Sequence, residues 1–139
     1  MNWNLIVRLS FFGFLMGGLS VSVLPEVVEA VMWILVYLFS AYVIAKRCTH
    51  KFFLNGFMLS MVNSGWVTGF HVIFYKTYLS EHPASDLMYS FLPLSDFPRL
   101  GMVIMAPVFG AFFGVFLGLF SLIMSKVIKR NPGNEKNIG

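Results

Sequence analysis

Four long apolar segments, separated by short polar ones, dominate the pattern of this chain. They cover about residues 4–24, 27–45, 52–75 and 100–125, and the last two contain no Asp, Glu, Lys or Arg. A helix needs about 20 predominantly apolar residues to cross the hydrocarbon core of a membrane, and each segment is close to that length. The pattern therefore predicts an all-α integral membrane protein with four antiparallel transmembrane helices, formed as a single domain over residues 1–130.

The connections between these segments differ in length. Those near 24–27 and 46–51 are tight, so the spans that they join must be antiparallel neighbours. The connection from 76 to 99 is longer, and Pro83 can occupy the first turn of a short helix within it. That helix would place four apolar side chains on one face: Leu87, Met88, Phe91 and Leu92. We expect it to be interfacial, lying along the membrane surface between the third and fourth spans.

Charge is distributed unequally between the two sides of this predicted domain. Eight of the 10 Lys and Arg residues, but only one of the 6 Asp and Glu residues, border the N-terminus, the 46–51 connection and the C-terminal segment. That side carries a net charge of +7 and the other side −3. Since Lys and Arg favour the cytoplasmic side, both termini are predicted to be cytoplasmic, including a disordered polar tail at 131–139. The small size and compact loops favour a bacterial inner membrane.

The composition argues against several other classes of protein. The chain is 58 % hydrophobic and 12 % charged, whereas about 25 % of residues are charged in soluble domains. Its basic residues border apolar segments and form no patch interleaved with aromatic residues, so no nucleic-acid partner is expected. The histidines match no metal-ligand spacing, and one intramembrane histidine cannot clamp a haem between two axial ligands. No metal, cofactor or catalytic residue is therefore predicted.

Small residues form a stripe on the fourth span. Gly110, Gly114 and Gly118 recur every four residues and leave a flat groove along the helix, and Gly13 and Gly17 give the first span a matching small face. In lipid, helices associate through close backbone approach and van der Waals contact. One interpretation is that the first span packs against the fourth inside the bundle. The other is an exposed groove for self-association or for another membrane subunit.

The third span carries a polar stripe. At about 3.6 residues per turn, five polar side chains share one helical face: Ser60, Asn63, Ser64, Thr68 and His71. An ionisable residue inside a span is a functional candidate by default. His71 is therefore either part of a proton-linked or substrate-binding route lined by the other four residues, or a neutral imidazole that makes a structural hydrogen bond between helices.

These features lead to three hypotheses for function. The leading one is a non-catalytic accessory or assembly protein that acts by helix packing through the glycine face, because no catalytic signature is present. The alternative is a small oligomeric transporter or channel that uses the polar stripe of the third span. A membrane enzyme is the third, since helices distant in sequence can assemble a site.

Overall fold

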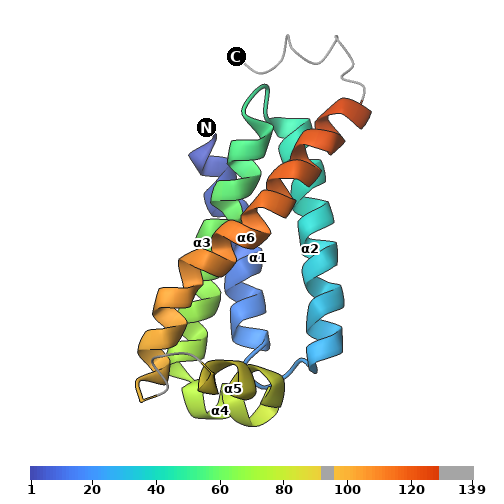
Figure 1. Ribbon diagram of the computed structural model, residues 1–139. Coiled ribbons are helices and arrows are strands. Elements are labelled where there is room, and N and C mark those ends of the chain that lie inside the picture. The colour runs from blue at the N-terminus through green and yellow to red at the C-terminus, as the bar shows by residue number, and fades with distance from the viewer. Residues whose placement is uncertain (92–95, 129–139) are drawn as a thin grey trace.

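The computed structural model describes residues 1–91 and 96–128, and within these ranges all regular secondary structure is helical (Figure 1). The all-helical fold predicted from the apolar segments is thus confirmed. Helices α1, α2, α3 and α6 form a bundle, and α4 and α5 lie across one of its ends. The bounds are α1 Trp3–Leu19, α2 Glu26–Arg47, α3 Phe52–Ile73, α4 Tyr75–Glu81, α5 Pro83–Ser90 and α6 Pro98–Val127.

Local sequence explains where these helices begin. The side chain of Asn2 caps α1 by accepting a hydrogen bond from the backbone N–H of Leu5 at 3.1 Å. Pro25 directly precedes α2, and Pro98 occupies the first turn of α6, where a missing N–H costs no helical hydrogen bond. Lys51 precedes α3 with φ 56°, a left-handed conformation that reverses the chain after α2.

Two helices, α2 and α6, are long and apolar enough to cross a membrane, and α3 with α4 forms a third span if the bent pair is counted as one. Helix α1 is also apolar but has only 17 residues. Large apolar side chains are exposed on the outside of the bundle, as at Val27, Leu35 and Phe112. Apolar surface of this extent marks membrane or protein contact, and the fold is compatible with a membrane location.

Helix α3 packs against α6 through the predicted glycine stripe. A Cβ atom added at Gly110, Gly114 or Gly118 would lie 3.0 Å or less from a side-chain atom of α3. The contact is reciprocal, because a Cβ at Gly56 of α3 would lie 2.7 Å from the backbone O of Leu117. The absence of side chains at these positions is therefore what lets the two helices approach so closely.

Helix α1 packs against the other side of α3. A Cβ at Gly17 would lie 3.1 Å from Cα of Val67, and one at Gly13 would overlap the side-chain amide of Asn63. The expectation that the first span packs on the fourth is wrong: in the described part of the chain, α1 and α6 each make their main contacts with α3. A groove of small residues packs against a ridge of bulky side chains. Helix α3 supplies such side chains to both α1 and α6, whereas the two glycine grooves could not fill each other.

The half of the bundle nearest the N-terminus is close-packed. Its core combines buried residues of all four long helices: Ile6, Leu9, Ala41, Ile44, Leu59 and Leu117, with Cys48 beside them. Asn55 fixes the end of this half, since its Oδ1 accepts from the backbone N–H of Asn2 at 2.9 Å and its Nδ2 donates to the carbonyl O of Lys51 at 2.9 Å.

The other half of the bundle departs from the predicted boundaries. Helix α1 ends at Leu19 instead of residue 24, because the chain turns through residues 20–24 to reach Pro25. The predicted third span, 52–75, is broken at Phe74, whose backbone is not helical, and α4 leaves α3 at an angle of 97°. The short helix predicted from Pro83 is present as α5. Leu92 of its predicted face and the tail at 131–139 lie outside the described residues.

Candidate functional site

A cavity of about 680 Å³ lies in the half of the bundle next to α4 and α5. Helices α2, α3 and α6 contribute its walls, and α4 and α5 lie across its end. Much of the wall is apolar, with Ile34, Val67, Met102, Phe109 and Phe113 among the lining residues. Sites for small molecules typically have volumes of about 300–1,000 Å³, so the cavity is large enough for a ligand of ordinary drug size.

The polar stripe of α3 faces this cavity. All five of its residues line the cavity: Ser60, Asn63, Ser64, Thr68 and His71. The hydroxyl of Ser60 is 3.2 Å from the Tyr37 hydroxyl of α2, and Ser64 donates to the carbonyl O of Ala106 in α6 at 2.6 Å. The stripe therefore forms hydrogen bonds to both neighbouring walls.

Asn63 differs from the other residues of the stripe. Its side chain is 2 % exposed, and neither amide atom has a hydrogen-bond partner among the described residues. It occupies the space that Gly13 leaves on α1. A buried amide without a partner costs about 1–3 kcal/mol. Asn63 therefore packs closely against α1 but loses the hydrogen bonds that its amide would form in water.

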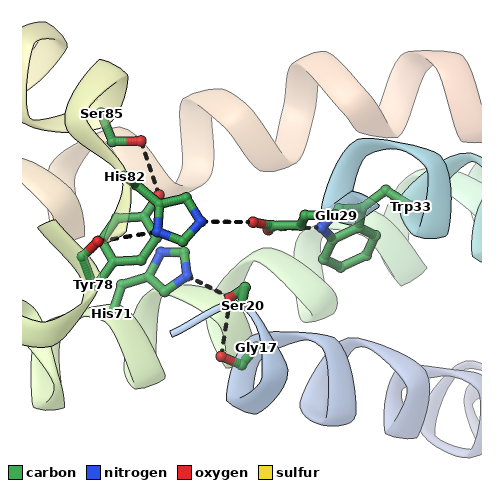
Figure 2. Close-up of polar contacts among 8 residues, drawn as sticks. All are labelled: Gly17, Ser20, Glu29, Trp33, His71, Tyr78, His82 and Ser85. Carbon is green, nitrogen blue, oxygen red and sulfur yellow. Dashed lines mark hydrogen bonds and ion pairs between the residues drawn. The ribbon is translucent and has the colours of Figure 1, made fainter. Parts of the chain in front are cut away.

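A cluster of polar side chains occupies the end of the cavity beneath α4 (Figure 2). We call it the polar end, and it comprises Ser20, Glu29, His71, Tyr78 and His82. These residues come from the C-terminus of α1, the first turn of α2, the last turn of α3, and α4 with its C-cap. The break at Phe74 is what brings the last two of them over the cavity, because α4 folds back across the end of the bundle.

Three rings of the polar end form a continuous stack. The centroids of His71 and Tyr78 are 3.7 Å apart with planes at 15°, and those of Tyr78 and His82 are 4.5 Å apart with planes at 25°. Each end of the stack is held by a hydrogen bond: Nε2 of His71 is 2.8 Å from Oγ of Ser20, and Nε2 of His82 is 3.2 Å from Oε2 of Glu29. The stack thus joins α1 to α2 across the cavity end.

The hydrogen bonds determine how protons are arranged in this cluster. Ser20 donates its hydroxyl hydrogen to the carbonyl O of Gly17, so its Oγ accepts from Nε2–H of His71. Nδ1 of His82 lies 3.0 Å from the carbonyl O of Tyr78, which can only accept. The second contact, between Nε2 of His82 and Oε2 of Glu29, is an ion pair only when the imidazole is protonated.

The cavity lining has an excess of negative charge. Glu26, Glu29 and His82 line the cavity, and no Lys or Arg of the described residues lines it. Burial, followed by the effect of Tyr78, raises the pKa of Tyr89 to about 12, and burial also raises the pKa of Tyr78. Both phenols are therefore uncharged at neutral pH, and Glu26 and Glu29 are the acidic groups of the lining.

Sequence reasoning missed the contribution of α2 to this site. Glu29, Trp33 and Tyr37 recur every four residues and point from one face of α2, where Nε1 of Trp33 donates to Oε1 of Glu29 at 3.3 Å. The four-residue spacing could have been recognised in the sequence, because it places these polar and amphipathic residues on one face of the helix as a second stripe. The part played by His82 had no such signal, because it depends on the fold of α4.

The glycines singled out in the sequence do not form an open groove. Five of them are buried against α3: Gly13, Gly17, Gly110, Gly114 and Gly118. Among these, Gly110 also borders the cavity. The groove that a partner subunit would need is filled by the chain itself.

Metal binding finds no support in the described part of the chain, where no three His, Cys, Asp or Glu residues are grouped to hold an ion. The lining instead combines an apolar wall, aromatic rings, and hydrogen-bonding groups at one end. This is the composition of a site for a small organic molecule. The sequence matches no protein-family model, and comparison with curated proteins and with solved structures finds no similar protein.

Proposed function

We propose that this protein is a small membrane transporter that binds an amphiphilic molecule in the cavity between α2, α3 and α6. The observation that carries the proposal is the position of the polar stripe: Ser60, Asn63, Ser64, Thr68 and His71 all line a cavity of about 680 Å³ with apolar walls. Ionisable and hydrogen-bonding groups inside a span are costly and commonly mark substrate pathways. The apolar wall would hold the body of the molecule and the polar end its head group.

The proposed topology has four spans with both termini cytoplasmic. The C-terminal ends of α2 and α6 and the start of α3 lie at the end of the bundle that holds the N-terminus (Figure 1). These helix ends carry the basic residues Lys46, Arg47, Lys51 and Lys126. At the other end lie the acidic first turn of α2 and helices α4 and α5. The excess of Lys and Arg at the first end supports a cytoplasmic assignment for it. The polar end of the cavity would then open towards the outside.

Helices α4 and α5 are placed to control access to the cavity. They are short, are joined to α3 by the break at Phe74, and are held at the polar end by the ring stack and by the hydroxyls of Tyr78 and Ser85, 3.1 Å apart. Short helices with few buried residues belong to the less stable parts of a structure. Movement of this pair about Phe74 would admit a molecule from the outer side.

The accessory-protein hypothesis has less support. It rested on the glycine groove and on the absence of a catalytic signature, and the five glycines of that groove are buried against α3. Helix packing within the chain accounts for the whole stripe. Association with itself or with another subunit would have to use other surfaces, and the glycines give no reason to propose it.

The first test is binding of a neutral amphiphile, triphenylphosphine oxide, to the purified protein in lipid nanodiscs. Ala106→Phe places a phenyl group in the cavity wall, whereas Val108→Phe places the same group on the exposed face of the same helix. We expect saturable binding that Ala106→Phe abolishes and Val108→Phe preserves. Binding unaffected by Ala106→Phe, or no saturable binding, would contradict the cavity as a ligand site.

The second test separates transport from binding. Proteoliposomes that contain the wild type, Ala106→Phe, His71→Ala or Val108→Phe are loaded with labelled triphenylphosphine oxide and diluted. Efflux is compared with that from loaded liposomes without protein. Transport predicts protein-dependent efflux that is lost in Ala106→Phe and His71→Ala and kept in Val108→Phe. Saturable binding without any protein-dependent efflux would leave a ligand-binding protein and reject the transport proposal.

A further inference from the structure

We infer that the cavity selects an amphiphilic organic cation, with the cationic head at Glu26, Glu29 and the surrounding aromatic rings. The inference rests on the proposed function, because it names the class of molecule that the same cavity would bind. Three observations carry it: the sign of the charge in the lining, the aromatic side chains beside that charge, and the absence of a cluster suited to a metal ion.

The charge of the lining favours a cation over an anion. Glu26 and Glu29 lie one turn apart at the start of α2, and both line the cavity. His82 contacts only Glu29, and no Lys or Arg of the described lining offers a partner to an anion. An anion in this space would meet a carboxylate without a compensating cation. The partly buried Glu29 carboxylate repels an anion, and attracts a cation, more strongly than a fully solvated carboxylate would.

Aromatic rings surround the same carboxylates. Trp33 is hydrogen-bonded to Glu29 and packs edge-on against Tyr37, with centroids 5.8 Å apart. Tyr78 stacks between His71 and His82, so both of its faces are covered and Trp33 and Tyr37 are the rings left to contact a cation. A cation over the face of Trp or Tyr is attracted by the ring quadrupole, and sites for quaternary ammonium groups combine such rings with nearby acids. Both elements of such a site are present here.

The lining favours an organic cation over a divalent metal ion. Divalent metal ions such as calcium require about six or more oxygen ligands, and the described residues contain no group of three His, Cys, Asp or Glu placed to hold a metal. An organic cation needs no such shell, because rings and one or two carboxylates can replace its weak hydration. Phe109 and Phe113 extend the apolar wall beyond the rings, so the preferred cation carries a bulky apolar body.

The experiment compares two ions of the same shape and opposite charge, tetraphenylphosphonium and tetraphenylborate, for binding to the protein in nanodiscs. The expected result is that the cation binds at least about tenfold more tightly than the anion, a factor that corresponds to about 1.4 kcal/mol. Glu29→Gln and Glu26→Gln should each weaken binding of the cation several-fold. Neither should change binding of the neutral triphenylphosphine oxide. Glu81→Gln, which removes an acid outside the cavity lining, is the matched control.

The outcomes separate the inference from the function on which it rests. Equal or tighter binding of tetraphenylborate, with loss of binding in Ala106→Phe, would overturn the cation selectivity and leave the cavity as a ligand site. Selectivity that survives both glutamate substitutions would also overturn the inference, because the charge would then act from elsewhere. If Ala106→Phe left the binding of all three probes unchanged, both proposals would be rejected. Since Glu26 is exposed, its variant tests the charge even if Glu29→Gln impairs folding.

Discussion

The two halves of α2 behave differently against the same neighbours. All of its buried residues lie in the C-terminal half, at Ser40, Ala41, Ile44 and Ala45, and there the helix belongs to the close-packed core. Its N-terminal half has no buried residue and instead borders the cavity with Glu29 and Trp33, while Tyr37 lies at the junction of the two halves and borders both the cavity and the core. One helix therefore serves as core in one half of the bundle and as cavity wall in the other.

Side-chain size and polarity explain the difference. Three of the four buried residues in the C-terminal half are Ser or Ala, which permit close approach of helices. In the N-terminal half and at the junction the inward positions hold a carboxylate, an indole and a phenol that require partners and space. Figure 1 shows the matching geometry: the C-terminal end of α6 lies near α2, whereas the N-terminal end of α6 lies over α3. The cavity occurs where α6 diverges from α2.

The largest effect should come from breaking the close contact between α3 and α6. In Gly56→Leu the new Cβ would lie 2.7 Å from the backbone O of Leu117, which cannot rotate away as a side chain would. Overpacking of this kind costs about 1–3 kcal/mol and sometimes more, and we expect about 3 kcal/mol or more. The measurement is the midpoint of unfolding by sodium dodecyl sulfate in mixed micelles.

Gly65→Leu is the matched control for this prediction. It lies on the same helix, but a Cβ there meets no atom within 4 Å. The unfolding midpoint should change little, since the side chain extends away from the bundle. If Gly56→Leu and Gly65→Leu lowered the unfolding midpoint equally, the contact between α3 and α6 would not be what stabilises the close-packed half.

This contrast also separates what the sequence could predict from what it could not. The glycine spacing and the apolar lengths follow from local periodicity, so the helices and the small faces of α1 and α6 were predictable. The partner of each small face was not, because both grooves accept bulky residues and α3 carries Phe53, Phe57 and Phe70 for them. The stripe from Ser60 to His71 was equally visible. The contact of His82 with Glu29 was not, since it depends on a 97° bend within a run of apolar residues.

The next largest effect should follow from removing one partner of the polar end. In His82→Ala, Glu29 loses its hydrogen bond at 3.2 Å and the ring stack ends at Tyr78. An acceptor left without its partner in a partly buried site costs about 1–3 kcal/mol. We expect that loss to appear as faster amide hydrogen exchange in α4 and α5, with the core around Ile44 and Leu59 unchanged.

Glu81→Ala, next to His82 but exposed, is the control and should leave exchange in α4 and α5 unaltered. If His82→Ala instead accelerated exchange throughout the bundle, the polar end would be part of the global core. The distinction between a stable half and a locally opening half would then be lost.

A smaller effect of opposite sign is expected where the two halves meet. Asn63→Leu replaces a buried amide that has no partner by an apolar group of similar size, so unfolding should require about 1 kcal/mol more. Ser64→Ala, one residue away, removes the hydrogen bond to the carbonyl O of Ala106 and should lower stability by about 1 kcal/mol. Both changes are read from the same unfolding midpoint. A loss of stability in Asn63→Leu would mean that the amide forms a favourable interaction in the native protein.

The smallest effect concerns only the half of the bundle that contains the cavity, and it is expected only at high pH. Burial, together with Tyr78, raises the pKa of Tyr89 to about 12, whereas an unfolded tyrosine titrates near about 10. The folded state therefore disfavours the phenolate, and the stability that this provides is complete below pH 10 and is lost as the pH rises towards 12. Tyr89→Phe should remove this part of the alkaline loss without altering unfolding at neutral pH. Tyr42→Phe, on the exposed side of the close-packed half, should leave the alkaline loss unchanged. A phenolate absorbance that rises near pH 10 for every tyrosine would show that water reaches Tyr89 freely, so the end of the cavity beneath α5 would be a wet opening instead of a covered site.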